Sequence, residues 1–203
     1  MDDLKLGVLM FFYPVKACAL IKRRRDGFRP LPVLILVGLA LLVRVAGVYT
    51  TSFTVASIRP QDANLLYETG ILLVPFLAWV LCSYAILSIM SGETKLTENL
   101  TACSYCLVPY IVITPLLTAL SHMVSTGEAA LFDTLSMIVL IWVLLLLFTA
   151  LKSLNDIHLG RALFIALLSV MLMLILAAAV MLVVALIGQV VNFAVEIVKE
   201  LRL

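Results

Sequence analysis

Cys103 and Cys106 have the Cys-x-x-Cys spacing that supports thiol redox chemistry in soluble proteins. Here they stand in an apolar stretch, near the predicted cytoplasmic end of a membrane-spanning helix, in a compartment that keeps thiols reduced. We therefore expect both to be small, buried apolar side chains. His122 and His158 fall on opposite sides of the membrane under the predicted topology, and neither lies in an HExxH pattern. No zinc site is predicted.

Arg44 is the one full charge deep inside an apolar block. It lies about 20 Å along the predicted helix, where an arginine costs at least about 2.5–3.5 kcal/mol. Glu68 or Asp133, near the outer ends of their own blocks, could pair with it. Alternatively, the side chain reaches interfacial water or carbonyls freed by a proline. A structural role is favoured over a functional one, because no second buried charge completes a relay.

Sequence patterns typical of enzymes are missing. The chain has no GxSxG nucleophile elbow, no GxxxxGK phosphate loop and no intramembrane carboxylates for proton coupling. We therefore expect no enzyme activity, no cofactor and no nucleic-acid partner.

The composition is that of a membrane protein. Hydrophobic residues are 64% and charged residues 13% of the 203, against about 25% charged in a soluble protein. A helix needs about 20 apolar residues to cross a hydrocarbon core about 30 Å thick. Lipid offers no partner to a free backbone N–H or C=O, so we predict an all-α, polytopic bundle of five transmembrane helices. The predicted spans are Leu31–Ser57, Leu65–Met90, Leu100–Met123, Leu131–Leu151 and Ala162–Val191.

Lysines and arginines are distributed unevenly between the two sides of this bundle. If the N-terminus is inside, ten lie inside: Lys5, Lys16, Lys22, Arg23, Arg24, Arg25, Arg29, Lys95, Lys152 and Arg161. Three lie outside, namely Arg59, Lys199 and Arg202, and Arg44 completes the total of fourteen. The positive-inside rule predicts a multi-pass protein of the cell membrane, with a cytoplasmic N-terminus and an exterior C-terminus.

The segment Asp2–Phe28 cannot cross a bilayer, because Pro14 and Lys16 interrupt its apolar residues. We predict one or two short amphipathic helices in the cytoplasmic interface. Four apolar residues share helical spacing and are expected to face the acyl chains: Leu6, Leu9, Met10 and Tyr13. A basic run follows, formed by Lys22, Arg23, Arg24 and Arg25. This run would bind anionic lipid headgroups, at about 1 kcal/mol per cation, or it would only fix the topology.

The stretch Ser91–Pro115 joins a polar loop directly to an apolar segment. Thr94 is the predicted N-cap of the helix, and Glu98 falls in its first turn, where the helix dipole favours a carboxylate. Pro109 and Pro115 are expected to kink the span that follows.

Small residues in the first and fifth spans would let helices approach closely. They are Gly38, Ala177, Ala178, Ala179, Ala185 and Gly188. Gln189 and Asn192 could form hydrogen bonds across helices near the outer surface.

The loop and the helix after it, GETKLTENLTACSYCLVPYIV, resemble the signature of the Yip (Ypt-interacting protein) domain family. The matching positions hold Gly92, Leu96, Tyr105, Pro109 and Tyr110. The segment YPVKACALIKRRRDGF, which opens with Tyr13 and Pro14, resembles the family's first proline-containing segment and its basic run. The chain looks most similar to the short bacterial members, which consist of the membrane domain alone.

This resemblance implies a five-span fold and a non-enzymatic membrane adaptor or accessory subunit. Residues 1–30 would be the interfacial segment, 31–195 the membrane domain and 196–203 an exterior tail. The implied partner is an integral membrane protein, with the permease of a carbohydrate ABC importer as the first candidate, and a homo-oligomer is also open. The alternative is an independent small transporter or channel, which Arg44 and the two prolines of the third span motivate.

Overall fold

The computed structural model describes residues 2–23, 29–52, 64–90, 92, 94–124 and 126–200, and this part contains helices and no strand. The all-α prediction is therefore confirmed. In chain order the helices are α1 (Asp2–Phe12), α2 (Pro14–Arg23), α3 (Pro30–Thr50), α4 (Leu65–Ile89), α5 (Leu96–Cys106), α6 (Val108–Ser121), α7 (Ala129–Leu154) and α8 (Leu159–Glu200), with a 3₁₀ turn at Thr126–Glu128.

Five helical stretches within the described residues are long and apolar enough to cross a membrane, which confirms the five-span prediction. They are α3, α4, the pair α5–α6, α7 and the Leu159–Phe193 part of α8. The third stretch begins at Leu96 and the fifth at Leu159, each a few residues before the predicted start. The first turns of both helices contain polar residues. A prediction based on runs of apolar residues therefore starts each span too late.

The third span is broken into two helices at Leu107, as expected from Pro109. A proline has no N–H for the i→i−4 ladder, and its ring crowds the preceding turn. The Leu107 N–H therefore closes a shorter turn on the Ser104 carbonyl at 3.2 Å, and α6 starts again with Pro109 in its first turn. Pro115 lies inside α6, which continues to Ser121.

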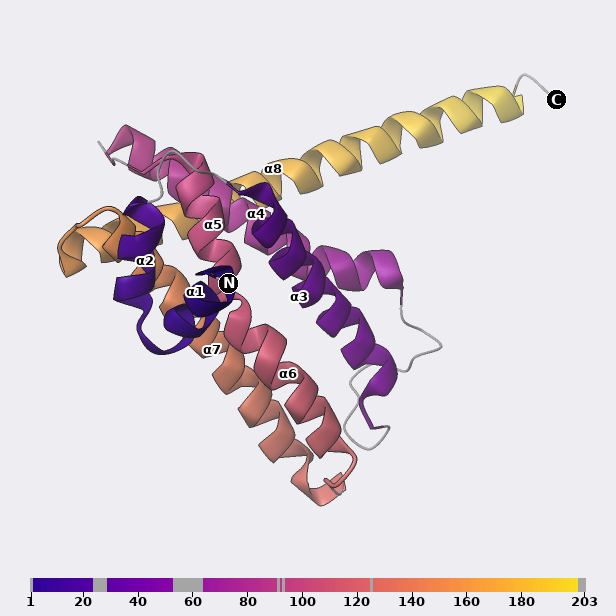
Figure 1. The fold of residues 1–203 in the computed structure, drawn as a ribbon. Coiled ribbons are helices and arrows are strands. Elements are labelled where there is room, and N and C mark those ends of the chain that lie inside the picture. Colours follow the sequence, from indigo (N-terminus) through magenta and orange to yellow (C-terminus); the bar gives the residue numbers. More distant parts are fainter. Residues whose placement is uncertain are drawn as a thin grey trace.

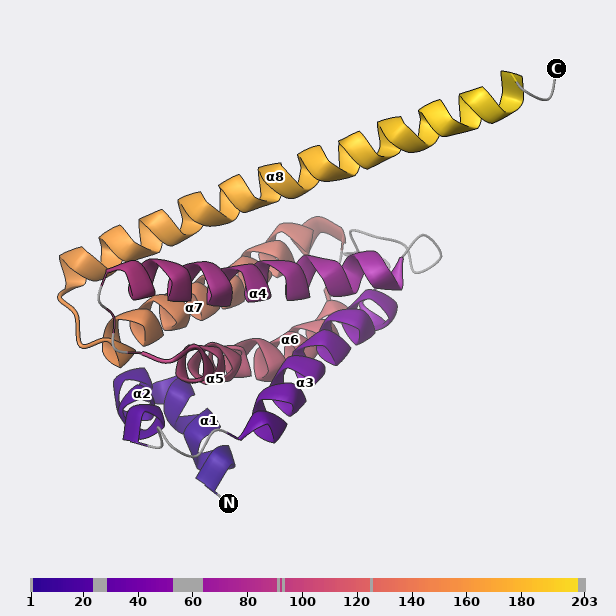
Figure 2. The ribbon, with the colours of Figure 1, turned by 90° about the horizontal axis from the view of Figure 1, so that it is seen from above.

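The core of the bundle lies where α5, α6 and α7 meet (Figure 1). α3 crosses α5 and α6 and also contacts α4, while α1 and α2 cover one end of the α5–α7 layer. α8 packs mainly along α4 and also contacts α7 (Figure 2). The buried side chains at the centre of this arrangement include Val80, Ala102, Cys106, Val143 and Ala150.

α8 continues far beyond the helices that it packs against (Figures 1 and 2). It has 42 residues, or about 63 Å at about 1.5 Å per residue. Ala162, Ile165 and Ser169 are buried near its start, whereas the side chains from Leu174 to Phe193 are exposed.

The predicted small-residue contacts are therefore wrong as contacts within this chain. A Cβ added to Gly38 or Gly188 would meet nothing within 4 Å. The alanines and polar residues of α8 that were expected at helix contacts are exposed: Ala177, Ala178, Ala179, Ala185, Gln189 and Asn192. An apolar surface is stable in lipid without protein contact, so hydrophobicity alone did not show whether lipid or another helix lies against this part of α8.

Candidate functional site

The N-terminal hairpin, formed by α1 and α2, is docked on the bundle. Leu6 and Met10 are only 3% and 0% exposed and belong to the central core, against α5 and α6. The prediction that these two residues face acyl chains is therefore wrong. The exposed apolar side chains lie on the other side of the hairpin: Val8, Phe12, Tyr13, Val15 and Leu20. α1 is apolar on more than one face, so its periodicity did not reveal which face the protein covers.

Tyr13 and Pro14 form the turn of this hairpin. Pro14 is the first residue of α2, a position that suits its fixed φ and its missing N–H. The Tyr13 ring is exposed, and the Lys16 Nζ lies 5.0 Å from its centroid. At the other end of α2, Lys22 and Arg23 occupy the last turn, where the helix dipole favours cations. Arg24 and Arg25 lie outside the described residues.

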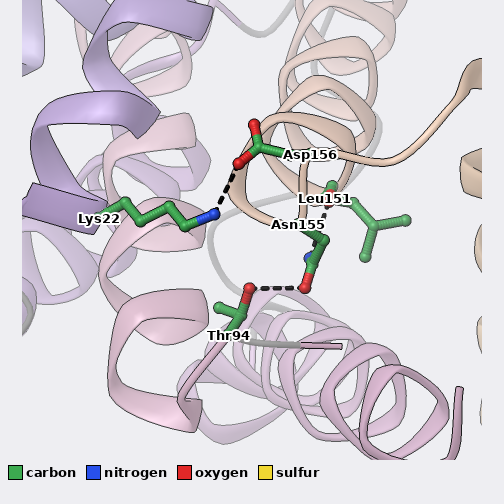
Figure 3. A network of polar contacts seen from close by, with 5 residues as sticks. All are labelled: Lys22, Thr94, Leu151, Asn155 and Asp156. Atoms are coloured by element: carbon green, nitrogen blue, oxygen red, sulfur yellow. Dashed lines mark hydrogen bonds and ion pairs between the residues drawn. The ribbon is translucent and has the colours of Figure 1, made fainter. Parts of the chain in front are cut away.

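Lys22 brings α2 to a polar cluster that we call the loop junction, which contains Lys22, Thr94, Asn155 and Asp156 (Figure 3). Gly92, which lies against Asn155, completes it. The Lys22 Nζ pairs with Asp156 Oδ2 at 2.6 Å, and the Thr94 hydroxyl donates to Asn155 Oδ1 at 2.6 Å. The Asn155 amide donates in turn to the Leu151 carbonyl at 2.9 Å. The loop junction thus joins α2, the loop before α5 and the turn between α7 and α8.

The sequence around this turn is suited to a tight connection. Asp156 has φ 49°, in the left-handed region that aspartate tolerates better than most residues. A second contact closes the same end of the bundle, because Arg161 at the start of α8 donates to the Met90 carbonyl at 2.6 Å. The turn is therefore held from both α2 and α4.

The loop junction leaves no room for a side chain at position 92, so a glycine is required there. Its N–H donates to the Leu87 carbonyl at 2.7 Å. A Cβ at this position would lie 3.0 Å from the Leu87 oxygen and 3.1 Å from Asn155 Oδ1. The glycine of the family motif therefore permits a close approach between the end of α4 and the α7–α8 turn.

Thr94 is not the N-cap of α5 as predicted. The N-cap is Lys95, whose backbone N–H donates to Glu98 Oε2 at 3.0 Å. Glu98 thus lies in the first turn of α5, as expected, and accepts a hydrogen bond from the N-cap backbone. The Thr94 hydroxyl is used for Asn155 instead, and that partner lies 61 positions away in the sequence.

The remaining motif residues do not join the loop junction. Leu96 is exposed at the start of α5, while Tyr105, Pro109 and Tyr110 are buried. Within the same span, the Asn99 amide donates to the Val80 carbonyl and to the Ser83 hydroxyl, both at 3.0 Å. The motif therefore combines a polar contact at one end of the bundle with helix packing in its core.

A basic groove runs between α2 and α7, next to the loop junction. Its volume is about 790 Å³, and its charged residues are Lys22, Arg23, Lys152 and Asp156. Asp156 pairs with Lys22, which leaves Arg23 and Lys152 as the cations available to a ligand. Val15 and Phe148 contribute apolar walls. The arrangement suits a ligand with an anionic head and an apolar body.

Arg44 is paired with Glu68, one of the two predicted partners. Glu68 Oε2 accepts from Arg44 Nε at 3.0 Å and lies 2.7 Å from Nη2. The Glu68 side chain is only 3% exposed and that of Arg44 is 35% exposed. Of the two candidates, the structure thus selects Glu68 as the partner of Arg44. Glu68 lies in the first turn of α4, where the helix dipole also favours a carboxylate.

The cysteines are buried free thiols, as predicted for Cys103 and Cys106. Cys18 of α2 belongs to the same core cluster. Burial raises the pKa of the Cys18 thiol to about 12. Cys103 lies beside Asn99, with its Sγ 3.8 Å from Asn99 Oδ1.

Sequence reasoning missed Asn155 and Asp156. The sequence could have predicted a turn at these residues, because a polar Asn-Asp pair between two apolar blocks indicates a tight turn. Their partners could not be inferred from the sequence, since Lys22 is 134 positions away from Asp156.

A family model described as the Yip1 domain matches residues 8–194, which include α2, the loop junction and the Arg44–Glu68 pair. The chain belongs to the Yip1 domain family. The resemblance seen in the sequence is thereby confirmed over nearly the whole chain. No curated protein and no solved structure gives a significant match.

Proposed function

We propose that this Yip1 domain protein is a non-enzymatic adaptor that binds another integral membrane protein through the exposed face of its N-terminal hairpin. The observation that carries the proposal is the division of the hairpin into two apolar faces. One face is locked into the core through Leu6 and Met10, and the other exposes Phe12 and Val15 at 68% and 60%. Such a patch on a fixed element fits a docking surface.

The hairpin is well suited to binding because it is already ordered. Its buried residues Ala17, Cys18 and Ile21 hold α2 against α7 and α5, and Lys22 adds the pair with Asp156. A surface that needs no ordering loses less conformational entropy when a partner binds.

The proposed orientation places the hairpin on the cytoplasmic side of the cell membrane, following the excess of lysine and arginine at this end. Here the basic groove would hold an anionic lipid, with its phosphate near Arg23 and Lys152 and its acyl chains along Val15 and Phe148. The first candidate for the partner is the permease of a carbohydrate ABC importer.

Purification in a mild detergent tests this proposal. The double variant Phe12→Ser, Val15→Ser changes two exposed residues of the hairpin, so folding should be kept while recovery of a co-purifying integral membrane protein falls about tenfold. Leu66→Ser together with Met123→Ser is the matched control, since both residues are 84% exposed and lie on other helix ends. Deleting the hairpin is a poorer test, because it would also uncover the core around Met10.

The proposal fails if wild-type protein recovers no integral membrane partner, or if only the control pair lowers recovery. A reporter that is active only in the cytoplasm tests the orientation separately: it should work when fused near Lys95 and fail when fused at Leu203. The opposite pattern would place the hairpin outside.

A small transporter or channel is the second candidate, and one observation favours it. A cavity of about 250 Å³ with polar and apolar lining residues lies between α3, α6 and α7 and includes Arg44. Ion or solute flux through liposomes that contain only the purified chain would support this function. Loss of that flux in Arg44→Gln, with unchanged folding, would connect it to the cavity.

A further inference from the structure

The cavity between α3, α6 and α7 has both apolar side chains and a group of charged and hydroxyl side chains in its lining. Its polar residues include Arg44, Tyr110, Thr114, Asp133 and Ser136. The cavity lies toward the C-terminal ends of α3 and α6, away from the loop junction. These two helix ends lie beside each other, because the Ser52 N–H donates to the Ser121 hydroxyl at 3.0 Å.

On one side of this cavity is a hydrogen-bond donor surface. A guanidinium has five N–H donors, and Glu68 takes the Nε and Nη2 side of Arg44. Arg44 keeps further donors, and its side chain is 35% exposed where it lines the cavity. Tyr110 lines the same cavity with its hydroxyl-bearing side chain. This side suits an anionic oxygen.

A carboxylate stands on the α7 side. Asp133 lines the cavity at an exposed position, and no cation among the described residues pairs with it. Glu68 already compensates Arg44, so the three groups together have a net charge of −1. The α7 side therefore suits a cation.

The occupant must be polar. An apolar occupant would take water away from the exposed Asp133 and from the remaining donors of Arg44 without replacing its hydrogen bonds, which is unfavourable for charged groups. A volume of about 250 Å³ is too small for most drug-sized ligands, but it accommodates a compact headgroup.

We infer that this cavity binds a zwitterionic ligand of the phosphoethanolamine class, with its phosphate oxygens at Arg44 and Tyr110 and its ammonium group at Asp133. The ammonium group donates charge-assisted hydrogen bonds to the carboxylate, and the phosphate accepts them from the guanidinium. The same chemistry is available from a phosphatidylethanolamine headgroup of the adjacent leaflet or from free phosphoethanolamine.

Native mass spectrometry of the delipidated protein in detergent tests this inference. We expect phosphatidylethanolamine to bind about tenfold more tightly than phosphatidylglycerol, which lacks the ammonium group. Phosphatidylcholine should lie between them, because its quaternary ammonium keeps the charge but has no N–H to donate. Free phosphoethanolamine is added as a competitor. Displacement of the lipid would identify a soluble ligand as able to fill the site, and lipid binding without displacement would identify the headgroup of an intact lipid.

Asp133→Asn should lower phosphatidylethanolamine binding about tenfold and remove the preference over phosphatidylglycerol. Glu128→Gln is the matched control, since Glu128 stands five positions earlier and does not line the cavity. Equal binding of the two lipids by the wild-type protein would overturn the inference, whatever the variants do. So would full phosphatidylethanolamine affinity in Asp133→Asn.

Discussion

Replacing Gly92 by alanine should destabilise the loop junction. The new Cβ would stand 3.0 Å from the Leu87 oxygen and 3.1 Å from Asn155 Oδ1. Ordinary van der Waals contacts begin at 3.4 Å. The end of α4 and the α7–α8 turn must therefore separate by a few tenths of an ångström. Neither neighbour moves easily, because Leu87 is held in a helix and Asn155 is fixed by Thr94 and Leu151.

The expected cost is that of overpacking a closed site, about 1–3 kcal/mol. In a chain of 203 residues, each kcal/mol lowers the melting temperature by about 2–4 °C. Helical circular dichroism during heating in a mild detergent measures this shift. Gly160→Ala is the matched control at the same end of the bundle, because a Cβ there would meet nothing within 4 Å. That variant should be neutral or stabilising by up to about 1 kcal/mol.

A double-mutant cycle with Asn155→Ala identifies the neighbour that is pushed. Alanine at position 155 removes the oxygen that the new Cβ would contact, so Gly92→Ala should cost less in that background than in the wild-type chain. A Gly92→Ala protein that melts at or above the wild-type temperature would refute the described packing. Identical behaviour of the Gly92 and Gly160 variants would refute it as well.

Three further outcomes test other parts of the structure. Met10→Ala should lower the free energy of unfolding by about 2–5 kcal/mol, whereas exposed Phe12→Ala should cost less than about 0.5 kcal/mol; denaturant titration that gives the reverse order would show that α1 docks by its other face. Glu68→Gln should cost about 1–3 kcal/mol in the same titration, less than for a fully buried ion pair because Arg44 is 35% exposed, and unchanged stability would argue against the pair. Only the thiolate reacts with maleimide, and burial raises the pKa of Cys18 to about 12. At pH 7–8 a variant that retains only Cys18 should therefore be labelled after unfolding and not before, and labelling of the folded protein at the rate of a free thiol would contradict its burial.

The number of spans could be predicted from the sequence because it depends on local properties. Each apolar block is long enough to cross the bilayer by itself, and a helix satisfies its own backbone hydrogen bonds in lipid. Pro14 and Lys16 likewise exclude a sixth span within the N-terminal segment, and Pro109 predicts the break at Leu107. The family motif was recognisable for the same reason, since its residues lie within one continuous stretch.

The tertiary structure alone decided which surfaces meet. Lipid is as apolar as a protein core, so hydrophobicity could not distinguish the buried face of α1, with Met10, from the exposed face, with Phe12. For the same reason, the sequence could not show whether the apolar surface of α8 contacts other helices or lipid. The partner of Thr94 and the choice of Glu68 for Arg44 depend on the rotation and depth of helices far apart in the chain. Those quantities are set by the packing of all the helices together, because no local pattern specifies how one helix turns against another.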